Sequence, residues 1–131
     1  SILEANNFAT EPTLSGTLLA TSRNKVADSL TKSVTLSASQ NNYTWPTVCD
    51  TILVDANAAY SITGIVPRAK GTIVKIVNVD SSDVLTIAHG SASSSAANKI
   101  NINAGADLAL GSLDGKELIC TENATMGWSE N

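Results

Sequence analysis

Charged side chains are scarce in this chain of 131 residues. Asp, Glu, Lys and Arg together make up 15% of it, against about 25% in an ordinary soluble domain. Small uncharged residues, mainly Ser, Thr, Asn and Ala, stand in their place. Because charged groups are depleted at the centres of protein interfaces, this composition favours a subunit of an assembly. The plainer interpretation is a neutral, Ser/Thr-rich extracellular β domain.

Clusters of basic residues are absent as well. The eight Lys and Arg residues are scattered from Arg23 to Lys116, and the formal net charge is -4. We expect no nucleic-acid partner, since binding phosphates needs a basic footprint. An acidic membrane surface is disfavoured for the same reason. No apolar run approaches the roughly 18 residues of a membrane-spanning helix, so we expect no membrane partner.

The sequence lacks the motifs of the common catalytic and metal sites. His89 is the only imidazole available as a catalytic base, and we interpret it as structural. Two aspartate pairs, Asp80 with Asp83 and Asp107 with Asp114, are the nearest approach to paired carboxylates. A calcium loop needs more oxygen ligands than either pair supplies, so we interpret them as turn residues. We therefore expect neither an enzyme nor a metal or cofactor.

Cysteine is limited to Cys49 and Cys120, each in an apolar context. We expect two buried free thiols, because free Cys behaves as a small hydrophobe. A disulfide stays open as the alternative, although one pair is not a disulfide framework. The chain shows no secretory or lipidation signal and starts at Ser1, which suggests a removed initiator Met and synthesis in the cytoplasm.

β-branched residues dominate the stretch 71–89. Ile73 to Val79 is a nearly continuous run of Ile and Val, which suits a pleated, packed surface better than a helix. Asp80 to Asp83 supplies four residues with turn chemistry. Val84 to Ala88 resumes the apolar pattern. The stretch therefore predicts a β-hairpin.

The same design of short strand and polar turn recurs along the rest of the chain. It predicts about eight to ten short strands, typical of an antiparallel β-sandwich, a jelly-roll-like fold or a small barrel. We expect an all-β domain over 36–131, with a mobile Ser/Ala-rich loop at 90–97. The further predicted strands are 33–37, 48–54, 59–63, 99–103, 108–110, 117–121 and 126–129.

Residues 1–35 differ from the rest, because their apolar positions follow neither a helical nor a strand period and Pro12 and Gly16 interrupt them. We interpret them as an extended N-terminal arm that becomes ordered on another protein. A short helix over 24–32 is the alternative, although two turns are marginal alone. The arm residues expected to make the contact are Ile2, Leu3, Phe8, Leu14, Leu18 and Leu19.

Aromatic residues are few, at 4%, but Tyr43 and Trp45 fall in a stretch that reads as a loop. Exposed rings of this kind stack on sugars in carbohydrate-binding modules. The competing interpretation places them in the core or in a subunit interface.

The second half of the chain resembles the β domains of tailed-phage virion proteins, including head decoration (cement) proteins, head fibres and parts of tail fibres. The resemblance is carried by Ile-Thr-Gly-Ile at 62–65, Gly-Thr-Ile-Val-Lys-Ile-Val-Asn-Val at 71–79 and the Ser/Ala/Asn-rich loop ending in Asn98-Lys99-Ile100. Ala-Gly-Ala-Asp-Leu-Ala-Leu at 104–110 and the closing Gly-Trp-Ser at 127–129 complete it. It is a style of strand and turn rather than a diagnostic motif.

A chain of this length with an N-terminal arm is closest in style to a decoration protein. The resemblance then implies a homotrimer on the outer capsid surface of the virion, with the major capsid protein as its partner and the arm as its contact. A receptor- or carbohydrate-binding module of a phage fibre or spike, using Tyr43 and Trp45, is the second hypothesis. An extracellular adhesion domain is the third.

Overall fold

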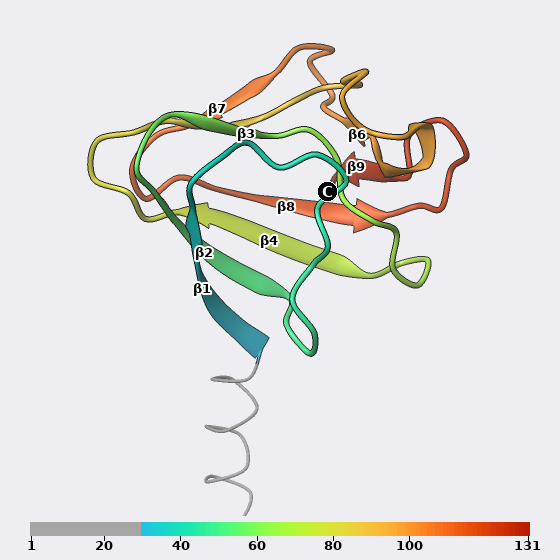
Figure 1. The fold of residues 1–131 in the computed structure, drawn as a ribbon. Helices are drawn as coiled ribbons and strands as arrows, with labels where there is room; N and C mark the ends of the chain where they lie inside the picture. Colours follow the sequence, from blue (N-terminus) through green and yellow to red (C-terminus); the bar gives the residue numbers. More distant parts are fainter. Residues whose placement is uncertain (1–29) are drawn as a thin grey trace, which may run out of the picture. The chain divides into compact units, whose positions relative to one another are not determined.

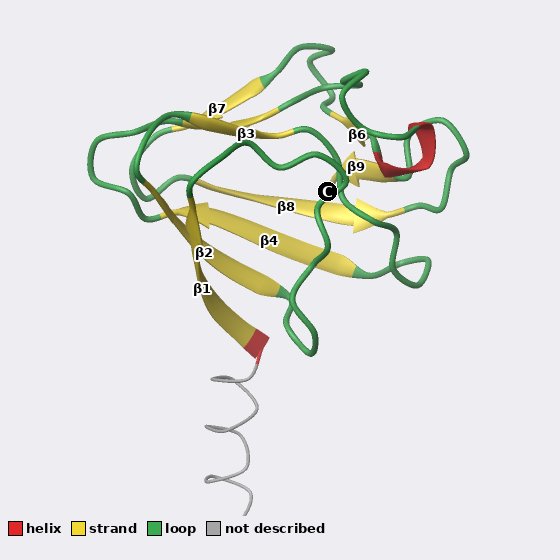
Figure 2. Ribbon diagram, viewed as in Figure 1, coloured by secondary structure: helices red, strands yellow, loops and turns green. Residues whose placement is uncertain are grey.

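The computed structural model describes residues 30–131. This part of the chain is all-β, as expected, and holds nine short strands in two mixed sheets (Figure 1). Apart from Leu30, helical geometry here is confined to one 3-10 turn, η1 (Ala96–Asn98) (Figure 2). The strands are β1 (Thr31–Leu36), β2 (Thr51–Ala56), β3 (Tyr60–Ile62), β4 (Ile73–Asn78), β5 (Leu85–Ile87), β6 (Ile100–Asn101), β7 (Leu108–Leu110), β8 (Gly115–Cys120) and β9 (Trp128–Glu130).

The larger sheet has six strands in the order β1-β2-β4-β8-β9-β6. β1, β2 and β4 run parallel to one another, β8 is antiparallel to β4 and β9, and β6 is parallel to β9. The smaller sheet has the order β3-β5-β7, with β3 parallel to β5 and β5 antiparallel to β7. In Figure 1 the strands β3 and β7 form a layer over the larger sheet.

The chain winds from one sheet to the other in successive coils. β1, β2 and β4 alternate along the sequence with segments of the smaller sheet, namely residues 40–43, β3 and β5. In the larger sheet Thr31 pairs with Thr51, and Thr51 in turn pairs with Lys75. The first coil therefore takes 20 residues (51 − 31), and the second takes 24 (75 − 51). Gln40 pairs with Ile62 and Ile62 with Ile87 in the other sheet. Residues 31–87 therefore form a short coil of the β-solenoid type, and β7, β8 and β9 close it with antiparallel pairs.

The core lies between the two sheets and is filled by alternate residues of the strands. Ile52 and Val54 of β2, Val74 and Ile76 of β4, and Leu118 of β8 are almost fully buried. Side chains of a strand alternate between its two faces, so the residues between them point to the outer face. β-branched residues stack well on this pleated surface, which is why these apolar runs form strands.

The predicted strand positions are confirmed, but the predicted pairing is wrong. Each of the nine predicted strands overlaps one observed strand. The antiparallel sandwich, jelly roll or barrel is replaced by mixed sheets, and the hairpin over 71–89 does not form. β4 and β5 belong to different sheets, because the turn 80–83 carries the chain across the core rather than back along β4. A coil and a hairpin both need a short polar turn, so the local pattern fits either.

Two further expectations change at their boundaries. β1 begins at Thr31, so residues 31–35 belong to the β domain rather than to the arm, and the alternative helix cannot reach Lys32. The loop 90–97 is anchored rather than loose, because Ser94 is 6% exposed. Its Oγ accepts a hydrogen bond from the Asn42 backbone N–H (2.9 Å) and shares one with Thr63 Oγ1 (2.8 Å).

Candidate functional site

The six apolar arm residues expected to contact a partner lie outside the described residues. Ile2, Leu3, Phe8, Leu14, Leu18 and Leu19 therefore stay a prediction from the sequence.

Trp45 is placed in the core, not on the surface. Its side chain is 7% exposed, and its indole N–H donates to the Cys49 carbonyl (2.6 Å). Tyr43 is half-buried and meets Trp45 edge to face, with ring centroids 6.2 Å apart and planes at 79°. Burial raises the pKa of the Tyr43 hydroxyl, with a smaller contribution from Cys49. Stacking on a sugar needs a free ring face, which Trp45 does not offer here.

His89 is tied into the fold through both its backbone and its ring. Its Nδ1 accepts a hydrogen bond from the Ile102 backbone N–H (2.9 Å), and its own N–H donates to Asp107 Oδ1 (2.8 Å). The ring therefore holds β6 in place, and its Nδ1 is occupied by a structural contact.

Asp80 and Asp114 are turn residues, whereas Asp107 holds the backbone of His89. Asp80 is 7% exposed, and its carboxylate accepts from the backbone N–H groups of Ser82 and Asp83. A side-chain hydrogen bond with Asp80 raises the pKa of Asp83, and so do desolvation and the nearby charges of Asp80 and Asp55. Asp114 Oδ2 accepts from the Gly111 N–H (2.9 Å). Within residues 30–131, no three His, Cys, Asp or Glu side chains come together in a way that could hold a metal ion.

Both cysteines are buried free thiols, as expected. Cys49 Sγ donates to the Thr51 carbonyl (2.9 Å) and Cys120 Sγ to the Arg68 carbonyl (3.2 Å). They are part of the core between the sheets.

Within residues 30–131, the coil has no further strand beyond β1. β1 is the last strand of the larger sheet and has β2 as its only neighbour among the described strands. Thr31, Lys32 and Ser33 are exposed, and Lys32 is the only charged residue of β1. An unpaired edge presents free N–H and C=O groups to any chain that can pair with them.

A groove lined by both polar and apolar side chains lies at the turn that leads into β2. Thr31 pairs with Thr51, so the start of β1 is beside the turn that leads into β2. That turn carries Val48, which is 65% exposed and has a φ of 54°, a strained value for a β-branched residue. Val48 and Val66 line this groove, of about 300 Å³, together with Thr44, Trp45, Pro46, Thr47, Pro67 and Arg68. We call Thr31, Lys32, Ser33, Val48 and Val66 the open-end surface.

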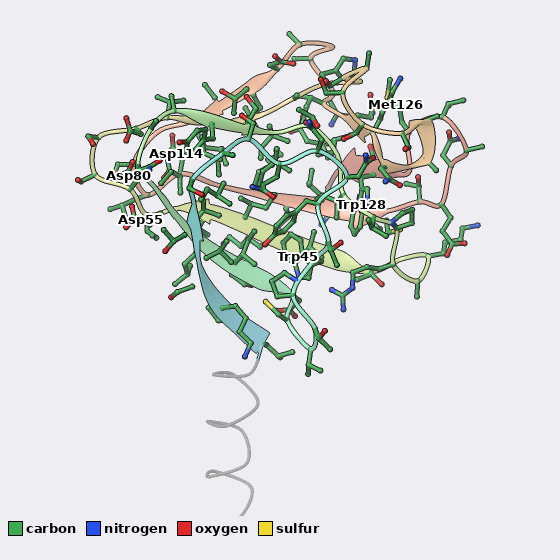
Figure 3. The ribbon with its side chains drawn as sticks, viewed as in Figure 1. Trp45, Asp55, Asp80, Asp114, Met126 and Trp128 are labelled. Carbon is green, nitrogen blue, oxygen red and sulfur yellow. The ribbon has the colours of Figure 1, made fainter. Side chains whose placement is uncertain are left out.

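A second groove, of about 430 Å³, lies on the outer face of the larger sheet, near β6 and β9. Ile100 and Trp128 are paired and buried, so their neighbours Asn101 and Ser129 face outward. The wall of the groove is the turn that follows β8, and Figure 3 shows Met126 there, far from Asp55, Asp80 and Asp114. Its lining residues are Asn101, Thr121, Asn123, Thr125, Met126 and Ser129.

This second groove is not evident from the sequence. Its residues come from separate strands and from one loop, and each looks like an ordinary turn or outer-face residue by itself. The only local signal is the uncharged polar alternation of Thr121, Asn123 and Thr125, which is common in this composition.

Within residues 30–131, no helix is long and apolar enough to span a membrane. Comparison of the chain with protein-family models, with curated proteins and with solved structures finds no match.

Proposed function

We propose that this chain is a structural virion protein of a tailed phage, a non-enzymatic capsid decoration protein. In this proposal it binds the assembled head on its outer surface as a homotrimer and stabilises it. Its partner is the major capsid protein, and it needs no cofactor, nucleic acid or membrane. The proposal rests on the resemblance of residues 62–129 to phage virion β domains and on the open end of the coil.

The open end is the observation that carries the proposal. A coil of stacked strands needs a cap at each end, because its last strand cannot satisfy its outer backbone groups by itself. Antiparallel pairing of β8 with β4 and β9 continues the larger sheet on one side, whereas β1 ends it without a described partner. Its surroundings are mostly uncharged, and Val48 and Val66 add exposed apolar area. Such a surface suits a protein partner, whose own surface removes the exposed groups from water.

Decoration of a capsid has a simple thermodynamic basis. A ligand that binds only the assembled lattice stabilises that lattice by mass action, like any ligand of a native state. Three copies held together multiply a weak contact through effective concentration. Closed threefold symmetry also limits open-ended pairing of the β1 edges. The arm residues named from the sequence, of which Leu19 is the last, come before β1 in the chain and are part of the proposed contact.

The first prediction concerns the open-end surface. We expect Val66→Asp to abolish co-sedimentation of the full chain with phage heads assembled without it, because the new carboxylate would have to be desolvated in the contact. Val84→Asp is the matched control. Val84 is 42% exposed and Val66 is 40% exposed, and β4 separates them along the chain. The control should bind heads like the unchanged protein.

Light scattering on the same proteins separates assembly from head binding. We expect the unchanged chain and Val84→Asp to have the mass of three copies. Equal head binding by both variants would remove the open-end surface from the proposal. A full-length chain that is monomeric in solution and fails to bind heads would contradict the decoration function itself.

The alternative of a receptor- or carbohydrate-binding fibre or spike module has less support in its original form. It needs Tyr43 and Trp45 to stack on a sugar, and Trp45, although it lines a groove, is only 7% exposed.

A further inference from the structure

The groove between Asn101 and Asn123 has a chemistry of its own. No charged side chain lines it, and its polar groups are two amides and three hydroxyls. An ion would find no opposite charge there. A neutral ligand that both donates and accepts hydrogen bonds would find both kinds of partner.

Asn123 is held rigidly at the wall of the groove. Its Oδ1 accepts three hydrogen bonds, from the Thr125 N–H (2.9 Å), the Thr125 hydroxyl (2.8 Å) and the Met126 N–H (3.2 Å). Those bonds fix the plane of the amide and leave its Nδ2 with two N–H donors. Within residues 30–131 neither donor has a protein acceptor. A donor that is already ordered costs little entropy when a ligand binds it.

Asn101 supplies the complementary group on the floor. Its Nδ2 donates to Ser129 Oγ (3.2 Å), which orients the side chain and leaves Oδ1 as an acceptor. The Ser129 hydroxyl keeps its own proton for donation. Asn101 and Ser129 on one side of the groove and Asn123 on the other thus present oriented donors and acceptors to the same space.

Met126 adds an apolar surface between these polar groups. A Cβ at Gly90 would lie only 3.0 Å from Met126 Cε, so the thioether rests against the backbone of the neighbouring loop. The side chain is half-buried and lines the groove. A polarizable thioether packs well against C–H surfaces.

The geometry points to a binding site for a neutral saccharide in this groove. A sugar ring carries neighbouring hydroxyls that donate and accept at once, which fits Asn101, Asn123 and Ser129. Its C–H face fits Met126. A volume of about 430 Å³ is in the range of small-molecule sites. The groove is open and has no aromatic ring, so we expect affinities on the order of millimolar for a short oligosaccharide. This site is separate from the open-end surface and goes beyond the proposed capsid role.

The test is a titration of the full, ¹⁵N-labelled chain with maltohexaose, cellopentaose, a galactose oligomer and an N-acetylglucosamine trimer. Sialyllactose and a uronic-acid oligomer serve as charged probes. The measured signals are the side-chain NH₂ resonances of Asn101 and Asn123. We expect saturable shifts of both with at least one neutral oligosaccharide. No shift with any neutral probe, or shifts only with the charged ones, would overturn the site.

A substitution at Asn123 separates binding from folding. Asn123→Asp keeps an oxygen for the three hydrogen bonds of the turn and removes the Nδ2 donors, so we expect binding to weaken by about tenfold or more. Asn57→Asp is the matched control, since Asn57 Oδ1 also accepts a hydrogen bond, from the Tyr60 hydroxyl (2.6 Å), but lies outside the groove. Unchanged affinity in Asn123→Asp, or equal loss in both variants, would contradict the proposal. Asn123→Asp should co-sediment with heads like the unchanged protein. A failure of the saccharide site can therefore be told apart from a failure of the proposed capsid binding.

Discussion

Asn78 shows how one polar side chain joins three parts of the core. It is 1% exposed, at the end of β4. Its Nδ2 donates to the carbonyls of Asp83 (2.9 Å) and Leu110 (2.8 Å), and its Oδ1 accepts from the Asp80 N–H (3.0 Å). A buried amide is tolerated because each of these groups has a partner. The bonds fix the turn that crosses from β4 to β5 and tie it to β7.

We therefore expect Asn78→Ala to destabilise the protein by about 2–4 kcal/mol, because it leaves a cavity and removes the partners of buried backbone groups. Urea unfolding checks this as a lower midpoint with an unchanged slope. Asn131→Ala is the control at an exposed site, where the change should stay within about 0.5 kcal/mol. A midpoint like that of the control would show that water replaces the lost bonds.

At the scale of elements, the Ser-rich loop 90–97 is docked against the smaller sheet through a close approach at Gly64. A Cβ on Gly64 would lie 2.4 Å from Ser94 Oγ and 2.8 Å from the Asn98 carbonyl oxygen. Asn42 Oδ1 accepts from the Ser95 N–H (2.7 Å) and from Asn98 Nδ2 (2.8 Å), which holds the same loop from the first coil. The loop thus contacts two successive coils, and only glycine leaves room for it.

The expected result of Gly64→Ala is a loss of stability of about 1–3 kcal/mol, since the loop must shift to relieve the overlap. Adding Ser94→Gly to it should recover part of this loss, because the nearest clashing atoms belong to Ser94. Thermal unfolding of the two single variants and the double variant measures this coupling. Strictly additive losses would mean that the loop is not docked through this contact.

The pairing of elements was the least predictable feature from the sequence. Ile52 and Ile76 lie side by side, and so do Ile62 and Ile87. These spacings of 24 (76 − 52) and 25 (87 − 62) are a weak repeat that indicates stacked coils. With only two coils of this kind and no identical turn residues, the signal does not stand out from ordinary alternation.

At the scale of the whole domain, two carboxyl groups make opposite contributions to the pH dependence of stability. The pKa of Asp83 is raised above its ordinary value of 3.8 by Asp80, so the charged form of Asp83 weakens the fold. This loss of stability therefore develops as the pH rises through the raised pKa of Asp83. The pKa of Glu130 is lowered below 4.5 by Lys116, with which it forms an ion pair, and by the Asn103 N–H. The stabilisation that the charged Glu130 gives to the fold is present above pH 4.5, and it is lost as the pH falls through the lowered pKa.

Substitution of each group should therefore change the melting temperature in opposite directions. We expect Asp83→Asn to raise it at neutral pH, with a difference from the unchanged protein that disappears once the pH falls below the ordinary Asp value. Glu130→Gln should lower it at neutral pH, and this difference should shrink in acid. Melting curves from neutral pH into the acid range check both signs. A lower melting temperature for Asp83→Asn at neutral pH would contradict the charge argument.

The sequence by itself determined the all-β class, the positions of the strands and the turn role of Asp80 and Asp114, and it favoured buried thiols over a disulfide. These follow from local physical chemistry: β-branched runs favour pleated backbone, and short polar side chains bond to the backbone beside them. The tertiary structure alone decided that β1, β2 and β4 run parallel, that Trp45 is buried, and that Asn101 and Asn123 face one groove. The strand pairing and the groove join residues about 20 or more positions apart. They depend on which distant segments close on one another, which an alternating pattern and a polar turn leave undetermined.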